Sequence, residues 1–169
     1  PQKLHFPMAS RGLAPTEFQK STYPASFRDR ITVVHDGIDT RTIRPSDAGK
    51  ITIGNSLNVT REDEVITFVA RNLEPYRGYH VFMRALPALL RERPNARVFI
   101  IGNNGTSYGA PPPNKDNWRD IFLREVQDQL DMSRVHFAGS LPYPVFLELL
   151  SISRLHIYLT YPFVLSWSL

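Results

Sequence analysis

Short continuous apolar runs and longer amphipathic runs alternate along the chain from residue 65 onward. The continuous runs are rich in β-branched residues, which is typical of strands buried on both faces of a sheet. They occupy residues 65–70 (VITFVA), 97–101 (RVFII), 135–137 (VHF) and 155–160 (LHIYLT). Apolar residues at helical spacing predict helices over 78–93, 118–130 and 144–152. This alternation predicts an α/β fold: a Rossmann-like parallel sheet with flanking helices and right-handed crossovers.

Local signals refine the predicted helices and loops. Pro87 lies inside the first helix, where a proline costs about 3 kcal/mol, so we expect a kink or a split there. Asn117 suits the cap of the second helix, and Pro144 suits the first position of the third. The Gly/Pro/Asn-rich segment at 102–117 is expected to be a long loop, either functional or simply mobile.

The first third of the chain shows weaker patterning. Residues 1–30 are expected to be irregular because prolines interrupt them. Residues 31–34 (ITVV) predict a short strand that runs into an Asp-Gly turn. Residues 40–64 predict a polar linker or loop with a weak strand at 51–53.

Composition narrows the classes of function. The 169 residues contain no cysteine, which excludes a disulfide framework, a thiolate zinc site and a cysteine nucleophile. The net charge is +4 and the pI about 9.6, which suits phosphate-bearing ligands, nucleic acid or an anionic membrane surface. The arginines are spread along the chain, so we expect no nucleic-acid partner.

The chain also lacks the segments that would direct it to or through a membrane. No apolar run approaches the ~20 residues of a membrane span, and the N-terminus has no apolar signal-peptide core. We therefore expect a cytoplasmic protein, with peripheral contact to a membrane surface left open. The first residue is not methionine, so we also expect a segment of a longer protein.

Two arginines mark the first candidate site. Arg71 follows the strand at 65–70, and Arg77 precedes the helix that opens at Gly78. Ligands of open α/β sheets bind at the carboxyl ends of the strands, and a helix N-terminus attracts anions. Two guanidinium groups there would clamp two phosphates. The alternative is a pair of surface arginines on a connecting loop.

Other candidates carry weaker signals. The glycines at 102–109 would let backbone approach a ligand, but a plain mobile loop explains them as well. The segment Gly139-Ser140-Leu141 follows the third strand at the same sheet edge, and an ordinary turn is the alternative.

The histidines do not point to a metal site. No pair has metal-ligand spacing on one helix, so no metal is expected. His136 and His156 lie in predicted strands and are expected to be hydrogen-bonded core groups, whereas His35 precedes a turn and is a weaker functional candidate. The chain also lacks a Gly-x-Ser-x-Gly elbow, which leaves an α/β-hydrolase without its nucleophile.

Several of these segments together resemble glycosyltransferase family four, which has a two-domain GT-B fold. Residues 31–45 (ITVVHDGIDTRTIRP) are similar to the hinge of that family, and residues 15–24 to the end of its N-terminal domain in a bacterial subgroup. Residues 68–102 resemble the family's strand, Gly-Arg, Lys-Gly, helix and strand block. Residues 135–141 (VHFAGSL) resemble the strand and turn that hold the nucleobase.

The resemblance implies domain boundaries and site residues. Residues 1–45 would be the end of the N-terminal domain and the hinge, and residues 46–169 a partial, incomplete GT-B C-terminal domain. The donor diphosphate would be bound by Arg71, Arg77, Gly78, Ser166 and Trp167. Backbone groups of Ser140 and Leu141 would bind the nucleobase.

The resemblance also implies a reaction. A nucleoside diphosphate sugar would donate its sugar to an acceptor hydroxyl with retention of configuration, without a metal or another cofactor. The donor is the expected partner, and the acceptor is undetermined. Phe163 stands where the family places its first glutamate, and the second would lie beyond Leu169, so this chain carries no catalytic residue and is expected to be inactive alone. The alternatives are a non-catalytic nucleotide-binding module, or a protein-interaction domain that uses the apolar residues 163–169.

Overall fold

The computed structural model describes residues 6–44, 50–53, 57–162, 165–166 and 168–169. The chain divides into two compact units, one formed by Pro1–Ile43 with Pro162–Leu169 and the other by Arg44–Tyr161. The predicted domain boundary between residues 45 and 46 falls on 45–49, outside the described residues. The boundary therefore stays a prediction.

Apart from the strand predicted at 31–34, which the structure confirms, the first unit contains short elements that the sequence pattern did not predict. Two parallel strands, β1 (Gly12–Ala14) and β2 (Ile31–Val33), pair with each other. A 3-10 turn and two short helices complete the unit: η1 (Phe6–Met8), α2 (Glu17–Ser21) and α3 (Ala25–Arg28). The expectation of irregular structure at 1–30 was wrong, because helices of four or five residues are too short to show a hydrophobic period. A local cap starts one of them: Thr16 accepts a hydrogen bond from the Gln19 N–H at 3.1 Å.

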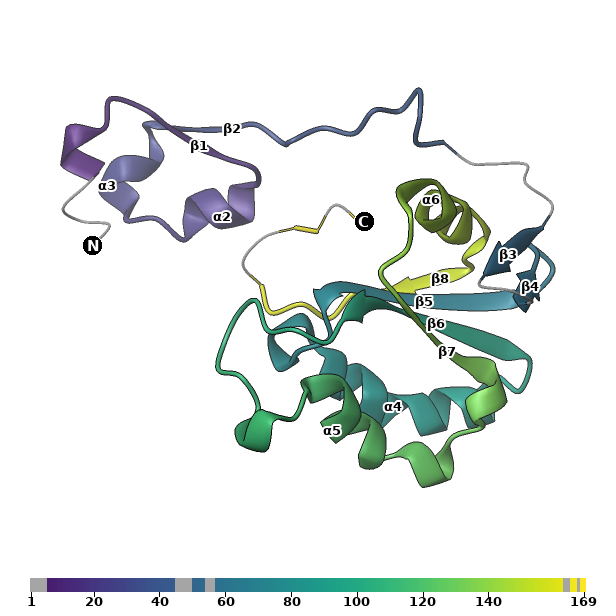
Figure 1. Ribbon diagram of the computed structural model, residues 1–169. Helices are drawn as coiled ribbons and strands as arrows, with labels where there is room; N and C mark the ends of the chain where they lie inside the picture. Colours follow the sequence, from purple (N-terminus) through teal and green to yellow (C-terminus); the bar gives the residue numbers. More distant parts are fainter. Residues whose placement is uncertain (1–5, 45–49, 54–56, 163–164, 167) are drawn as a thin grey trace. The chain divides into compact units, whose positions relative to one another are not determined.

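A four-stranded parallel sheet forms the centre of the second unit and confirms the predicted α/β class (Figure 1). Its strands are β5 (Glu64–Asn72), β6 (Ala96–Asn103), β7 (Val135–Gly139) and β8 (Leu155–Ile157). They lie in the order β7-β6-β5-β8, so the chain adds β6 and β7 on one side of β5 and then returns to add β8 on the other. The strand order therefore reverses at β5, and such a switch point is where open α/β sheets bind ligands.

Helices cover both faces of this sheet. Figure 1 shows α4 (Tyr79–Glu92) and α5 (Trp118–Arg124) on one face and α6 (Tyr143–Ile152) on the other. One apolar core lies between the sheet and α4, where Phe82, Met83 and Leu86 are almost completely buried. A second core lies on the α6 side and includes the hairpin of β3 (Ile51–Ile53) and β4 (Leu57–Val59).

The structure corrects several element boundaries. The helix expected over 118–130 ends at Arg124, and short 3-10 turns follow at Gln127–Gln129 and Met132–Arg134. Val126, with φ of −131° and ψ of −7°, leaves the helical region and buries its side chain instead. The strand expected over 155–160 ends at Ile157.

Pro87 does not split α4, which runs through it as one helix (Figure 1). The neighbouring Leu86 and Leu90 are buried on the same apolar face. Packing of this face against the sheet therefore outweighs the cost of the missing N–H.

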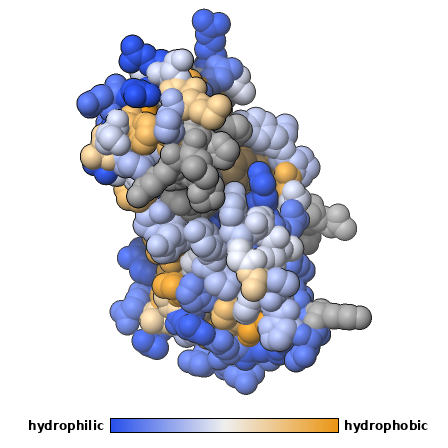
Figure 2. All heavy atoms as spheres, turned by 90° about the vertical axis from the view of Figure 1, so that its left-hand side faces the viewer, coloured by the Kyte–Doolittle hydropathy of each residue, from blue (hydrophilic) through white to orange (hydrophobic). Residues whose placement is uncertain are grey.

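Among the described residues, the helices are all too short or too polar to cross a membrane. On the face drawn in Figure 2, hydrophobic residues form small groups scattered among polar ones, which is ordinary for a globular surface.

Candidate functional site

The carboxyl ends of β5 and β6 are joined closely at one edge of the sheet. The Leu73 N–H, just past β5, donates to the Asn103 carbonyl at the end of β6, over 2.9 Å. A Cβ atom on Gly102 would lie 2.5 Å from the Ala70 carbonyl oxygen, so only glycine permits this approach. One of the glycines of the predicted 102–109 loop is therefore explained by packing between strands.

The connection from β5 to α4 turns sharply at Gly78. Gly78 ends the 3-10 turn η2 (Pro75–Arg77) with φ of 75°, in the left-handed region that favours glycine. Its N–H donates to the Pro75 carbonyl at 2.9 Å. A Cβ there would lie 2.2 Å from the carbonyl oxygen of Leu159. The residues after β8 therefore pack directly against this turn, and the Gly78 N–H is engaged within it.

Of the two predicted arginines, Arg77 lies on this connection, whereas Arg71, expected just after the strand, is still part of β5, which runs to Asn72. Arg71 is exposed near the end of β5, and Arg77 is half-buried at the end of η2. The Arg77 guanidinium lies over the ring of Tyr108, 4.9 Å from its centre. Tyr108 in turn stacks on Tyr76, with ring centres 5.7 Å apart. The Arg77 guanidinium therefore packs on the stacked rings of Tyr108 and Tyr76. Its binding to a diphosphate stays a prediction.

A buried glutamate at this edge was not identified from the sequence. Glu74 is fully buried, and its Oε2 accepts the backbone N–H groups of Ser107 and Tyr108 at 3.0 Å each. Its Oε1 is also buried and has no hydrogen-bond partner within the part of the chain that the structure describes. A glutamate between strand and turn gives no periodic signal, so only the structure reveals it.

The long loop predicted at 102–117 is tied down at several points. Besides the Glu74 contacts, the Asn72 side chain donates to the Ser107 hydroxyl at 2.5 Å, and the Trp118 indole donates to the Ala110 carbonyl at 3.3 Å. Asn117 caps α5 as predicted, since its side chain accepts the Asp120 N–H at 2.9 Å. The loop is therefore an ordered segment that places Tyr108 beneath Arg77.

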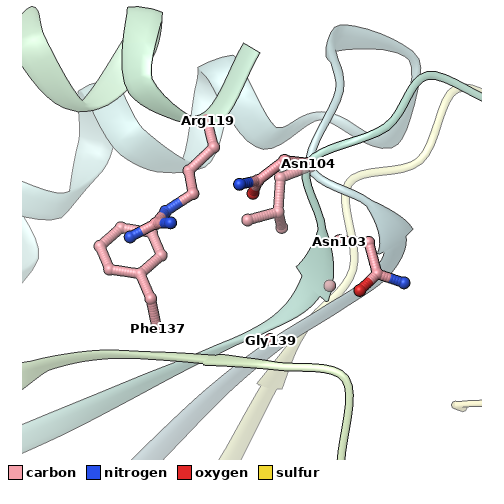
Figure 3. Close-up of a pocket in the computed structure, with 7 residues that line it drawn as sticks. Asn103, Asn104, Arg119, Phe137 and Gly139 are labelled. Atoms are coloured by element: carbon pink, nitrogen blue, oxygen red, sulfur yellow. The ribbon is translucent and has the colours of Figure 1, made fainter. Parts of the chain in front are cut away.

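A pocket of about 190 Å³ opens at the carboxyl ends of β6 and β7 (Figure 3). Its lining comprises Leu73, Gly102, Asn103, Asn104, Arg119, Phe137 and Gly139. The Arg119 guanidinium lies 4.4 Å from the centre of the Phe137 ring, and the Asn104 side chain points towards it from the opposite wall. Sequence reasoning placed Gly139 at this edge but missed Arg119 and Phe137.

The predicted nucleobase-binding residues follow this pocket in the chain. Gly139 turns with φ of 61°, after which Ser140 is exposed. Leu141 packs against the apolar core on the α6 side of the sheet. Leu141 could therefore contact a ligand only through its backbone. Binding of a nucleobase by Ser140 and Leu141 stays a prediction.

The predicted phosphate contacts near the C-terminus belong to the other unit. The Ser166 hydroxyl lies 3.0 Å from that of Ser168 and accepts the Ser168 N–H at 3.3 Å. Trp167 and Phe163 lie outside the described residues. Binding of a phosphate by Ser166 or Trp167 stays a prediction.

Two of the histidines, His136 and His156, lie in strands β7 and β8, as predicted. Burial lowers the pKa of His156, whose Nδ1 lies 3.0 Å from the Thr67 hydroxyl. His136 packs on Phe99, and its pKa is lowered by burial and then by the charge of Arg97. Its buried Nε2 has no hydrogen-bond partner among the described residues, so the expectation of a hydrogen-bonded core group does not hold for that atom.

The remaining histidine candidate closes a turn. His35 is exposed, and its Nδ1 accepts the Gly37 N–H at 3.0 Å. Across the described residues, no three His, Cys, Asp or Glu side chains gather as a metal site would require.

Comparison with known proteins places these features in context. The family model described as the glycosyl transferase family 4 group matches residues 1–43. A D-inositol 3-phosphate glycosyltransferase of Segniliparus rotundus is 28% identical over 89 residues, which cover 53% of this chain and 19% of that protein. The chain thus spans about a fifth of this relative.

Solved structures share the fold. The crystal structure of TarM superposes with a TM-score of 0.62 at 12% identity, over 93% of this chain and 27% of TarM. A TarM variant from S. aureus, in complex with fondaparinux, α-GlcNAc-glycerol and UDP, gives the same TM-score at 9% identity. At these identities the likeness shows the fold alone, which agrees with the α/β class that the sequence predicted.

Proposed function

Since this chain is a relative of the family-four glycosyltransferases, we propose that it supplies the donor-binding side of an enzyme that transfers a sugar from a nucleoside diphosphate sugar to an acceptor hydroxyl. Transfer with retention of configuration is part of the proposal. The observation that carries it is the placement of Arg71, Arg77 and a polar pocket at the carboxyl edge of a parallel sheet. Residues 1–45 would be the end of the acceptor-side domain and the hinge, and residues 46–169 the donor side.

The difficult step in such a reaction is departure of the nucleoside diphosphate. The bond between the sugar's anomeric carbon and the β-phosphate oxygen breaks, and negative charge develops on that phosphate. A bond forms between the anomeric carbon and the acceptor oxygen, whose proton passes to the departing diphosphate. Cationic groups fixed before the reaction stabilise the developing charge more than they stabilise the bound donor. Arg77 is suited to this because its guanidinium group already packs over the Tyr108 ring.

The chain's own groups supply that charge in the proposal, so it requires no metal or other cofactor. Arg71 and Arg77 would bind the two phosphates, while contacts from Ser166 and Trp167 are what the sequence resemblance alone implies. Gly78 would take part only if its turn opened, because its N–H is bonded to Pro75. The structure shows instead that Gly78 lets Leu159, after β8, pack directly against this turn.

Release of nucleoside diphosphate tests this function. The full-length protein is incubated with nucleoside diphosphate sugars, with and without candidate hydroxyl acceptors, and the released diphosphate is measured. We expect release that depends on an acceptor. Absence of release with every donor, together with no binding of nucleoside diphosphates by calorimetry, would remove the proposal.

A nucleotide-binding module without transfer activity is the second candidate. Phe163, at the position where the family has a glutamate, is the feature that favours it. This candidate predicts calorimetric binding of a nucleoside diphosphate without any release from a sugar donor. A cytoplasmic location, with the membrane surface as an alternative, remains part of the proposal for the full-length protein.

A further inference from the structure

The pocket beside Arg119 adjoins the proposed diphosphate site. Leu73, which lines the pocket, lies two residues after Arg71 and is hydrogen-bonded to Asn103, another lining residue. The pocket and the two arginines therefore share one strand end. A ligand with phosphates at Arg71 and Arg77 would have its next group within reach of this pocket.

The walls of the pocket offer hydrogen-bond donors. Arg119 supplies a guanidinium group, and Asn104 faces it with a side-chain amide (Figure 3). None of the described residues that line the pocket is acidic. A ligand that presents acceptors therefore suits these walls better than one that presents an amino group.

Arg119 is fixed in position yet keeps donor capacity. Its guanidinium carbon lies over the Phe137 ring, and its side chain is 32% exposed. Its Nε is buried and closed to a ligand, and Asp120 Oδ1, 3.8 Å from it, is beyond hydrogen-bonding distance, so the donors offered to the pocket are those of the exposed part of the guanidinium group. A planar donor held at the wall of a pocket is suited to pair with a carbonyl oxygen at the edge of a flat ring.

The family resemblance already implies that the donor's nucleobase binds at Ser140 and Leu141, next to Gly139 of this pocket. We propose that Arg119 selects there a base whose edge carries a carbonyl oxygen, such as uracil or guanine, over adenine. This inference rests on the proposed function, because it requires the diphosphate to bind at Arg71 and Arg77. A guanidinium donates to the carbonyl oxygens of uracil and guanine, whereas the corresponding edge of adenine presents an amino group. Adenine should bind more weakly because its amino group and the Arg119 guanidinium are both donors, so neither would find an acceptor in the other.

Calorimetric titration of the full-length protein with UDP, GDP, ADP and inorganic pyrophosphate tests the inference. In the unmodified protein we expect UDP or GDP to bind at least about tenfold more tightly than ADP, as one charge-assisted hydrogen bond allows. Arg119→Met keeps the apolar cover over Phe137 and removes the donors. It should abolish this preference while leaving the affinity for pyrophosphate unchanged.

Two further variants serve as controls. Arg91→Met removes an exposed arginine from α4, outside the pocket, and should change none of the affinities. Arg119→Lys keeps the charge but loses the planar fork, so it should retain only part of the preference and serves if Arg119→Met does not fold.

The outcomes separate this inference from the function beneath it. Equal binding of ADP by the unmodified protein, or a preference that survives in both Arg119 variants, would overturn the role of Arg119 while leaving the diphosphate site intact. Loss of pyrophosphate binding in Arg119→Met would also overturn it, since the arginine would then act on phosphate. If the unmodified protein binds neither pyrophosphate nor any nucleotide, the proposed function itself fails.

Discussion

At the scale of single residues, Glu74 has the most definite role in ordering the site. One buried carboxylate oxygen accepts two backbone N–H groups, and these anchor the loop that carries Tyr108 beneath Arg77. Glu74→Ala should leave both N–H groups without an acceptor and lower the free energy of unfolding by about 1–3 kcal/mol. Hydrogen exchange at Ser107 and Tyr108, measured with urea unfolding, checks this.

Matched variants isolate the effect of Glu74. Glu74→Gln retains an acceptor oxygen and should keep most of the protection of the two amides. Glu62→Ala removes an exposed glutamate that precedes β5 and should change neither measurement. Unaltered exchange at Ser107 and Tyr108 in Glu74→Ala would show that other contacts hold the loop.

A second residue-scale prediction concerns acid stability. Burial lowers the pKa of His156 below its ordinary value of about 6.5, so the unfolded chain binds the proton more readily than the folded one. The His156 contribution to stability is therefore full above the unfolded pKa and falls as the pH drops below about 6.5. Urea midpoints measured from pH 7.5 to 5 should decline, and they should decline less steeply in His156→Asn. Equal slopes in the two proteins would contradict the assignment.

At the scale of elements, hydrophobic period predicts long elements well and short ones poorly. The strands β5 and β6 and the helix α4 appear close to where continuous and amphipathic runs place them. The hairpin of β3 and β4 was half missed because each strand has three residues, too few for a pattern to emerge. The helix α5 stops early because Val126 packs into the core with a non-helical backbone, a tertiary effect invisible in the local sequence.

Pro87 gives a test at the same scale. Inside α4 it lacks the N–H that would bond to the carbonyl of Met83, one turn earlier. Pro87→Ala restores that donor, although it also makes the unfolded chain more flexible, so we expect a net stabilisation of about 1–2 kcal/mol. Chemical unfolding with urea measures it. A destabilised variant would mean that the proline ring contributes packing that alanine cannot replace.

At the scale of the whole molecule, the sheet order decides which residues meet. The class of fold and the sheet edge that carries Arg71, Arg77 and Gly139 followed from the alternation of strands and helices. The pocket did not, because Arg119, Asn104 and Phe137 come from a helix, a loop and a strand whose juxtaposition depends on the order β7-β6-β5-β8. Likewise, no sequence signal showed that residues after β8 would close on Gly78.

The same sheet geometry makes a prediction about charge. Arg71 and Arg61 are both exposed arginines, but Arg71 lies near the carboxyl end of β5 and Arg61 precedes its amino end. If the carboxyl edge holds the diphosphate, Arg71→Ala in the full-length enzyme should lower kcat by about 10²-fold. The substitution removes a positive charge next to the phosphate on which negative charge develops. Arg61→Ala changes the net charge equally and should leave kcat unchanged. Steady-state kinetics with a nucleoside diphosphate sugar distinguishes the two variants. Equal losses of kcat would mean that Arg71 only attracts anions in general. Unchanged kcat in both variants would mean that the reacting phosphate binds elsewhere.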